Sequence, residues 1–198
     1  LCLWDDLPNR LNELTKKNTG YKKISIDKSL KKISKLDPNL HIDLSGIAKG
    51  FAVDKIARYL DKRGFKNYLI EIGGELIGKG LNKDNEIWQI GIENPNNNSD
   101  TIKRIIRLKD MAMATSGNYM NYFEKDGVRY SHTINPVTGK PIKHKLASVT
   151  VLDNSAMNAD ALATAFMVLG SEKALSLANN LKIAVYLIIK DGKSFEEK

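Results

Sequence analysis

The stretch His41-Ile-Asp-Leu-Ser-Gly-Ile-Ala-Lys-Gly50 leads directly into a strongly patterned segment of the chain. A helix is predicted over residues 48–62, because Ala48, Ala52 and Ile56 recur at helical spacing near one face. Small residues open this helix, which leaves N–H groups of its first turn to bind an anion such as a phosphate. Lys49 would add a positive charge there. The alternative is a plain strand-to-helix turn with a lysine that faces solvent.

The chain on either side of this helix predicts a mixture of strands and helices. A buried strand over 68–72 ends in Gly73-Gly74, where a plain turn and a close backbone approach to a ligand or strand are equal alternatives. Further expected elements are a first helix over 7–16, strands over 87–92, 102–108, 147–152 and 183–189, a tight turn over 113–117, a hairpin over 123–134, and helices over 156–168 and 172–179. Strands and helices do not alternate strictly, so we expect an α+β fold of mixed or antiparallel sheets packed with helices. One domain over residues 1–198 is expected.

Composition excludes several classes of protein. The chain has 198 residues and a net charge of +8, from 31 Lys+Arg against 23 Asp+Glu. Its lysines are scattered and not interleaved with aromatic residues, so we expect a solvated surface and no nucleic-acid partner. The apolar runs are far shorter than the roughly 20 residues that span a bilayer. Cys2 is the single cysteine, which excludes an intramolecular disulfide.

Two positions late in the chain are candidates for chemistry. Asp160 and Thr164 lie four residues apart on one predicted helix, so their oxygens face the same way. A carboxylate, a hydroxyl and a nearby carbonyl suit a hard cation such as Mg²⁺, although an aspartate near a helix start is more often a cap. His132 precedes a rigid Asn-Pro loop and could be an acid, a base or a hydrogen-bond donor, while a structural histidine is the commoner case.

The order of six short motifs resembles one known family. They are Asp43-Leu-Ser-Gly-Ile-Ala-Lys-Gly-Phe-Ala-Val-Asp54, Ile72-Gly-Gly-Glu75, Ala114-Thr-Ser-Gly-Asn-Tyr119, Tyr130-Ser-His-Thr-Ile-Asn-Pro136 with Thr138-Gly-Lys-Pro141, Ser148-Val-Thr-Val151, and Ala159-Asp-Ala-Leu-Ala-Thr-Ala165 with Leu169-Gly170. Together they resemble the FAD:protein FMN transferase (ApbE-type) family over essentially the whole chain.

The resemblance implies an enzyme that splits FAD, transfers FMN to a threonine hydroxyl of an acceptor flavoprotein such as a redox-pump subunit, and releases AMP with the help of Mg²⁺. It implies metal ligands at Asp160, Thr164, Gly46 and Ala163, the last two through backbone carbonyls. It also implies FAD contacts at Asp43, Lys49 and Ile134, with the Gly73-Gly74 pair close to the flavin nucleotide. His132 and Asp160 would be the catalytic side chains.

The chain also departs from the family. It opens at Leu1-Cys2-Leu3-Trp4, which resembles an internal family segment, so an ApbE-like fold without its N-terminal strands is expected. Asn135 and Glu71 replace a usual aspartate and a common asparagine. Two alternatives stay open, namely a non-catalytic binder of FAD or another nucleotide, and an FAD hydrolase that yields FMN and AMP. A periplasmic or cell-surface location, with peripheral membrane anchoring through an upstream lipid, follows only from the family.

Overall fold

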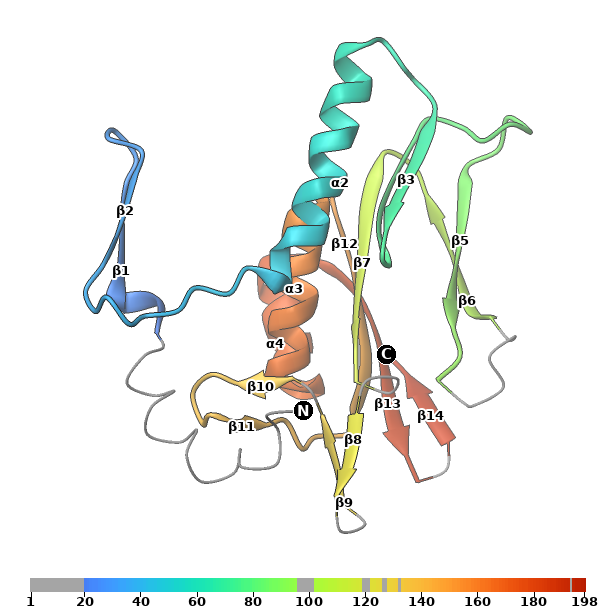
Figure 1. Ribbon diagram of the computed structural model, residues 1–198. Coiled ribbons are helices and arrows are strands. Elements are labelled where there is room, and N and C mark those ends of the chain that lie inside the picture. Colours follow the sequence, from blue (N-terminus) through green and yellow to red (C-terminus); the bar gives the residue numbers. More distant parts are fainter. Residues whose placement is uncertain (1–19, 96–101, 119–121, 126–127, 132, 193) are drawn as a thin grey trace. The chain divides into compact units, whose positions relative to one another are not determined.

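A computed structural model describes residues 20–95, 102–118, 122–125, 128–131, 133–192 and 194–198 (Figure 1). The chain forms two compact units: a small unit, Leu1–Asp43 with Phe123–Lys143, and a main unit, Leu44–Tyr122 with His144–Lys198. Helices and antiparallel sheets are mixed, so the predicted α+β class is confirmed. The predicted first helix over 7–16 lies outside the described residues, and the expectation of one domain stays a prediction.

The main unit is built on a six-stranded sheet in which every neighbouring pair is antiparallel. The strand order is β14-β13-β12-β7-β4-β3. The strands are β3 (Tyr68–Ile72), β4 (Glu75–Lys79), β7 (Met111–Gly117), β12 (Leu146–Asp153), β13 (Ala184–Asp191) and β14 (Ser194–Glu197). The first six residues of β12 are all buried, as expected for a central strand that is covered on both faces.

Helices cover one face of this sheet (Figure 1). They are α2 (Ser45–Lys62), α3 (Ala156–Leu169) and α4 (Ser171–Leu181). Val53 and Ala57 of α2 pack with Tyr68 and Ile70 of β3 in one apolar cluster. The helices α2 and α3 approach so closely that a Cβ on Gly50 would lie 2.2 Å from the Ala156 carbonyl oxygen. Glycine at this position is therefore a packing requirement.

A hairpin of β5 (Trp88–Glu93) and β6 (Ile102–Leu108) packs its apolar side chains with the strands of the sheet. Leu76 of β4 and Met113 of β7 pack with Leu108 in a second cluster. Because side chains alternate along a strand, Met113 faces this cluster while Ala112 faces the helices. The sheet thus has two distinct buried faces.

The small unit is a set of short antiparallel pairs. After a 3-10 turn at Tyr21–Lys23, β1 (Ile24–Asp27) pairs with β2 (Lys32–Lys35). The strand β8 (Tyr122–Lys125) starts at the unit boundary and pairs with β9 (Val128–Ser131). The third pair is β10 (Ile134–Asn135) with β11 (Lys140–Pro141). The loop between the last two is rigid because Asn135 Oδ1 accepts hydrogen bonds from the backbone N–H groups of Val137 and Thr138.

The structure differs from the prediction in several elements. The tight turn over 113–117 is wrong, because these residues lie in β7, between β12 and β4. The strands β4 and β14 were not predicted, and α2 begins at Ser45, three residues before the predicted start. In the part of the chain that the structure describes, no helix is both long and apolar enough to cross a membrane.

Candidate functional site

The first turn of α2 and the middle of α3 meet at Gly46 and Thr164. A Cβ on Gly46 would lie 3.2 Å from Thr164 Cγ2 and 3.3 Å from its Oγ1. The Thr164 hydroxyl also lies 3.3 Å from Ser116 Oγ of β7. The sheet and both helices therefore bring the hydroxyls of Ser116 and Thr164 close to the backbone of Gly46.

Asp160 lies one turn before Thr164 on α3 and is buried. Its Oδ2 accepts a hydrogen bond of 3.0 Å from the backbone N–H of Gly50. In a regular helix that N–H points to the carbonyl of residue 46, four positions earlier. The Asp160 carboxylate therefore competes with the Gly46 carbonyl for the Gly50 N–H. This leaves the Gly46 carbonyl oxygen more able to accept another partner.

These oxygens fit a small hard cation. A carboxylate, a hydroxyl and a carbonyl are ligands that Mg²⁺ accepts, and Mg²⁺ usually keeps several waters or substrate phosphates besides one or two carboxylates. Ala163 is fully buried and offers only its backbone carbonyl. Among the described residues no group of three His, Cys, Asp or Glu side chains is gathered as a metal cage. The residues present would thus hold Mg²⁺ only together with water or a phosphate.

Lys49, on the same helix turn, reaches across to the turn between β3 and β4. Its Nζ donates a hydrogen bond of 2.9 Å to the Gly73 carbonyl and lies 2.6 Å from Glu75 Oε2. The contact with Glu75 is an ion pair. Gly73 and Gly74 both have positive φ, at 57° and 98°. The glycine pair is therefore a turn that Lys49 approaches closely.

Glu75 was not among the predicted site residues. It is 2% exposed, and burial raises the pKa of its carboxyl, with Asp160 adding to that rise and Lys49 opposing it. Both carboxylates therefore feel each other's charge at the helix-covered face of the sheet. The motif Ile72-Gly-Gly-Glu75 contained this residue, but one sequence gives no signal that a glutamate after a turn is buried.

Three predicted residues do not belong to the described part of the main unit. Asp43 and Ile134 belong to the small unit. His132 lies outside the described residues. Their roles, like those of the predicted metal ligands, stay predictions.

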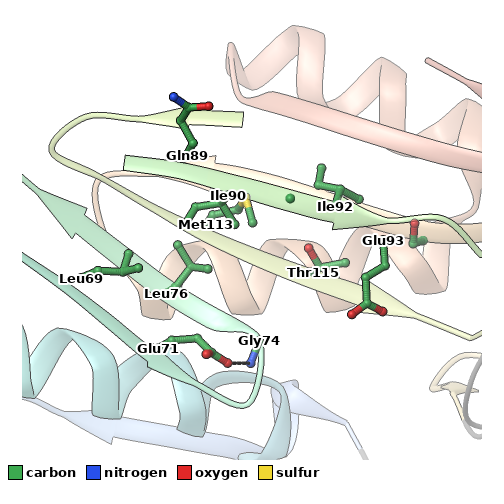
Figure 2. A pocket seen from close by; sticks show the side chains of 12 residues that line it. Leu69, Glu71, Gly74, Leu76, Gln89, Ile90, Ile92, Glu93, Met113 and Thr115 are labelled. Carbon is green, nitrogen blue, oxygen red and sulfur yellow. Dashed lines mark hydrogen bonds between the residues drawn. The ribbon is translucent and has the colours of Figure 1, made fainter. Parts of the chain in front are cut away.

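A separate pocket of about 500 Å³ lies beside the hairpin (Figure 2). Apolar side chains of Leu69, Leu76 and Met113 form part of its lining, and Gly74 is the one predicted site residue that contributes to it. Glu71 also lines this pocket, and Figure 2 shows its carboxylate accepting a hydrogen bond from the Gly74 N–H. The other lining residues are Gln89, Ile90, Gly91, Ile92, Glu93, Thr115 and Ser148.

The fold and the site define an α+β protein in which the glycine-opened first turn of α2 meets a buried aspartate of α3. A sequence profile of the ApbE family matches residues 6–187, and the chain belongs to this family. It is 49% identical over 179 residues to an FAD:protein FMN transferase of Vibrio cholerae and 46% identical over 182 residues to one of Haemophilus influenzae.

Each of these two alignments covers 90% of this chain and 53% of the relative, so the chain spans about half the length of the curated relatives it matches. Solved structures agree with the fold. The flavin transferase ApbE from Vibrio cholerae superposes with a TM-score of 0.83 at 45% identity, over 92% of this chain and 57% of that one. The apo flavinyl transferase ApbE of Pseudomonas stutzeri gives 0.82 at 43% identity, over 92% and 56%.

Proposed function

We propose that this chain transfers FMN from FAD to a threonine hydroxyl of an acceptor flavoprotein, with Mg²⁺, and releases AMP. The observation that carries the proposal is the meeting of Asp160, Thr164 and Gly46 beside Lys49 at the first turn of α2. Such a turn presents N–H groups to a phosphate, and Lys49 adds a positive charge to it.

The reaction is a phosphoryl transfer. The threonine Oγ forms a bond to the FMN phosphorus, and the bond from that phosphorus to the oxygen bridging to the AMP phosphate breaks. AMP leaves with the electron pair, and the hydroxyl proton is released, for which His132 is the proposed base. Reactions of this kind depend on positioning and charge neutralisation more than on a strong nucleophile.

The protein's own residues supply that positioning. Asp160, Thr164 and the carbonyls of Gly46 and Ala163 would hold Mg²⁺, which neutralises charge on the pyrophosphate when bound. Lys49 and the opening of α2 would orient the pyrophosphate beside it. Asp43 and Ile134 are proposed as further FAD contacts from the family resemblance alone.

The relatives support this reaction class because they are named FAD:protein FMN transferases. A redox-pump subunit as acceptor, a periplasmic or cell-surface location and a lipid anchor upstream of residue 1 are proposed from the family alone.

The deciding experiment combines the purified chain with FAD, MgCl₂ and a peptide that carries a threonine flavinylation motif, and records the peptide's mass. A gain of one FMN that EDTA abolishes supports the proposal. Free FMN and AMP with an unmodified peptide would show hydrolysis instead, and FAD binding without turnover would show a non-catalytic binder. Either result would overturn the transferase activity of this chain.

A further inference from the structure

The ion pair between Lys49 and Glu75 joins α2 to the first residue of β4, directly after the Gly73-Gly74 turn. Lys49 Nζ donates a hydrogen bond of 2.9 Å to the Gly73 carbonyl and pairs with Glu75 Oε2 at 2.6 Å, and these two partners are two residues apart on the chain. The side chain of Glu75 is 3% exposed, whereas that of Lys49 is 46% exposed. The carboxylate is thus hidden beneath an ammonium group that stays open to a ligand.

This arrangement contributes little to stability. Removing a carboxylate from water is costly, and the attraction to one partly exposed lysine offsets that cost only in part. The same two elements share a second ion pair, between Asp61 of α2 and Lys79 of β4, in which both side chains are more than a third exposed. An exposed pair of that kind avoids the burial cost. The buried acid therefore calls for another explanation.

Burial of Glu75 fixes the position of a flexible cation. A lysine side chain has four rotatable bonds, and an ammonium in water samples many positions. Here a backbone carbonyl and a buried carboxylate hold Nζ, and the stem lies close to the turn as well, because a Cβ on Gly73 would lie 3.2 Å from Lys49 Cδ. An ammonium has three N–H donors and Gly73 takes one of them, so a phosphate oxygen can accept another without moving the lysine.

We propose that Glu75 is a positioning residue that holds the Lys49 ammonium beside the first turn of α2, in place to bind a phosphate group of the flavin dinucleotide. This inference rests on the proposed function. Glu75 acts through Lys49 and does not itself touch the phosphate. Glu75 lies on the same face of β4 as Ile77, which packs with α2 and α3, so the Lys49–Glu75 pair and Asp160 of α3 lie on the helix-covered side of the sheet.

A double-mutant cycle in the transfer assay tests this dependence. Glu75→Gln keeps the size of the side chain and removes its charge, and Lys49→Met removes the ammonium. We expect each variant to lower kcat/KM at least about tenfold, and Glu75→Gln to act mainly on kcat. Since Glu75 acts through Lys49, adding Glu75→Gln to Lys49→Met should change kcat/KM less than about twofold. Losses that multiply in the double variant would overturn the proposal.

Asp61→Asn is the matched control, because it removes the exposed pair between the same helix and strand. It should change kcat/KM less than about twofold. Thermal melting of each variant corrects for any unfolded fraction. An equal loss of kcat/KM in Asp61→Asn would show that removing either ion pair between α2 and β4 impairs transfer. That result would overturn the specific role of Glu75.

A second readout is independent of transfer. With ¹⁵N-labelled lysine, the held ammonium of Lys49 should give a slowly exchanging NMR signal in the protein without ligand, identified by its loss in Lys49→Met. Glu75→Gln should remove that signal and Asp61→Asn should keep it. Absence of the signal in the unsubstituted protein would overturn the proposal that Glu75 holds the Lys49 ammonium in place. A clear signal in a chain that transfers no FMN would instead count against the proposed function alone.

Discussion

Asp160 is the residue on which the proposed cation site depends most. Asp160→Asn keeps the shape of the side chain and an oxygen that can accept the Gly50 N–H, so the fold should survive. The negative charge that would hold Mg²⁺ is lost. We expect FMN transfer to fall at least roughly a hundredfold, the upper end for loss of a group that supports a metal. Transfer kinetics across a MgCl₂ series measure this. A variant that recovers full transfer without added Mg²⁺ would contradict the site.

Gly73 provides a second test at the scale of one residue, and Gly192 is its matched control. Their φ angles are 57° and 58°, so an alanine at either position costs about 1–2 kcal/mol of unfolding free energy. The Cβ of Gly73→Ala would press on Lys49, whereas at Gly192 nothing lies within 4 Å. We expect urea titrations to show similar stability losses, and FAD titrations to show weaker binding only for Gly73→Ala. Equal FAD affinities would contradict the contact.

Single residues also show where sequence reasoning reaches its limit. The spacing of Asp160 and Thr164 on one helix face is a local property, and it was predicted correctly because both lie on α3. Glu75 depends on a lysine 26 positions earlier and on burial by a helix, neither of which is a local property. Acidic residues that follow two glycines are commonly exposed to solvent, so the sequence pattern alone could not identify Glu75 as a buried site residue.

At the scale of elements, a side chain of α2 caps the N-terminus of α3 and so joins the two helices. Asp54 of α2 accepts hydrogen bonds from Ser155 Oγ and from the backbone N–H groups of Ala156 and Met157, at the start of α3. Asp54→Ala leaves these donors without that acceptor, so we expect a loss of about 2 kcal/mol, the upper end for a helix cap. Urea denaturation measures it. Asp84→Ala, in an exposed turn, is the control and should stay within about 0.5 kcal/mol.

The helices were easier to predict than the strands. The pattern of α2 and α3 is visible because each buries one stripe, and both were predicted within three residues of their observed bounds. The strand β7 has the sequence Met-Ala-Met-Ala-Thr-Ser-Gly. Apart from the two methionines its residues are small, and the sequence as a whole has weak strand preference. Helices require small side chains on one of its faces, and its ladders with β12 and β4 hold it extended. Such pairing is tertiary, so the local pattern favoured a turn.

For the whole molecule, the proposed ligands predict coupled stabilisation. A ligand that binds only the folded state at a hundred times its Kd adds about 2.7 kcal/mol, or roughly 5–10 °C in melting temperature for a chain of this size. Mg²⁺ bridging the protein and the pyrophosphate would make FAD bind more tightly, so FAD with MgCl₂ should raise the melting temperature more than the sum of the separate shifts. Thermal melts with each ligand alone, with both, and with both plus EDTA measure this coupling.

The joint effect of FAD and MgCl₂ on the melting temperature distinguishes two cases. Either the residues of this chain bind the ligands, or binding depends on the half of the relatives' length that this chain does not match. If Asp160, Thr164 and Lys49 hold the pyrophosphate and its cation, this chain should show the joint shift, and Asp160→Asn should lose the part that depends on Mg²⁺ while keeping a weaker FAD shift. A joint shift of the same size in Asp160→Asn would contradict the proposed cation site. No shift with any ligand would show that these residues do not hold the dinucleotide by themselves, and that binding requires contacts beyond the span of this chain.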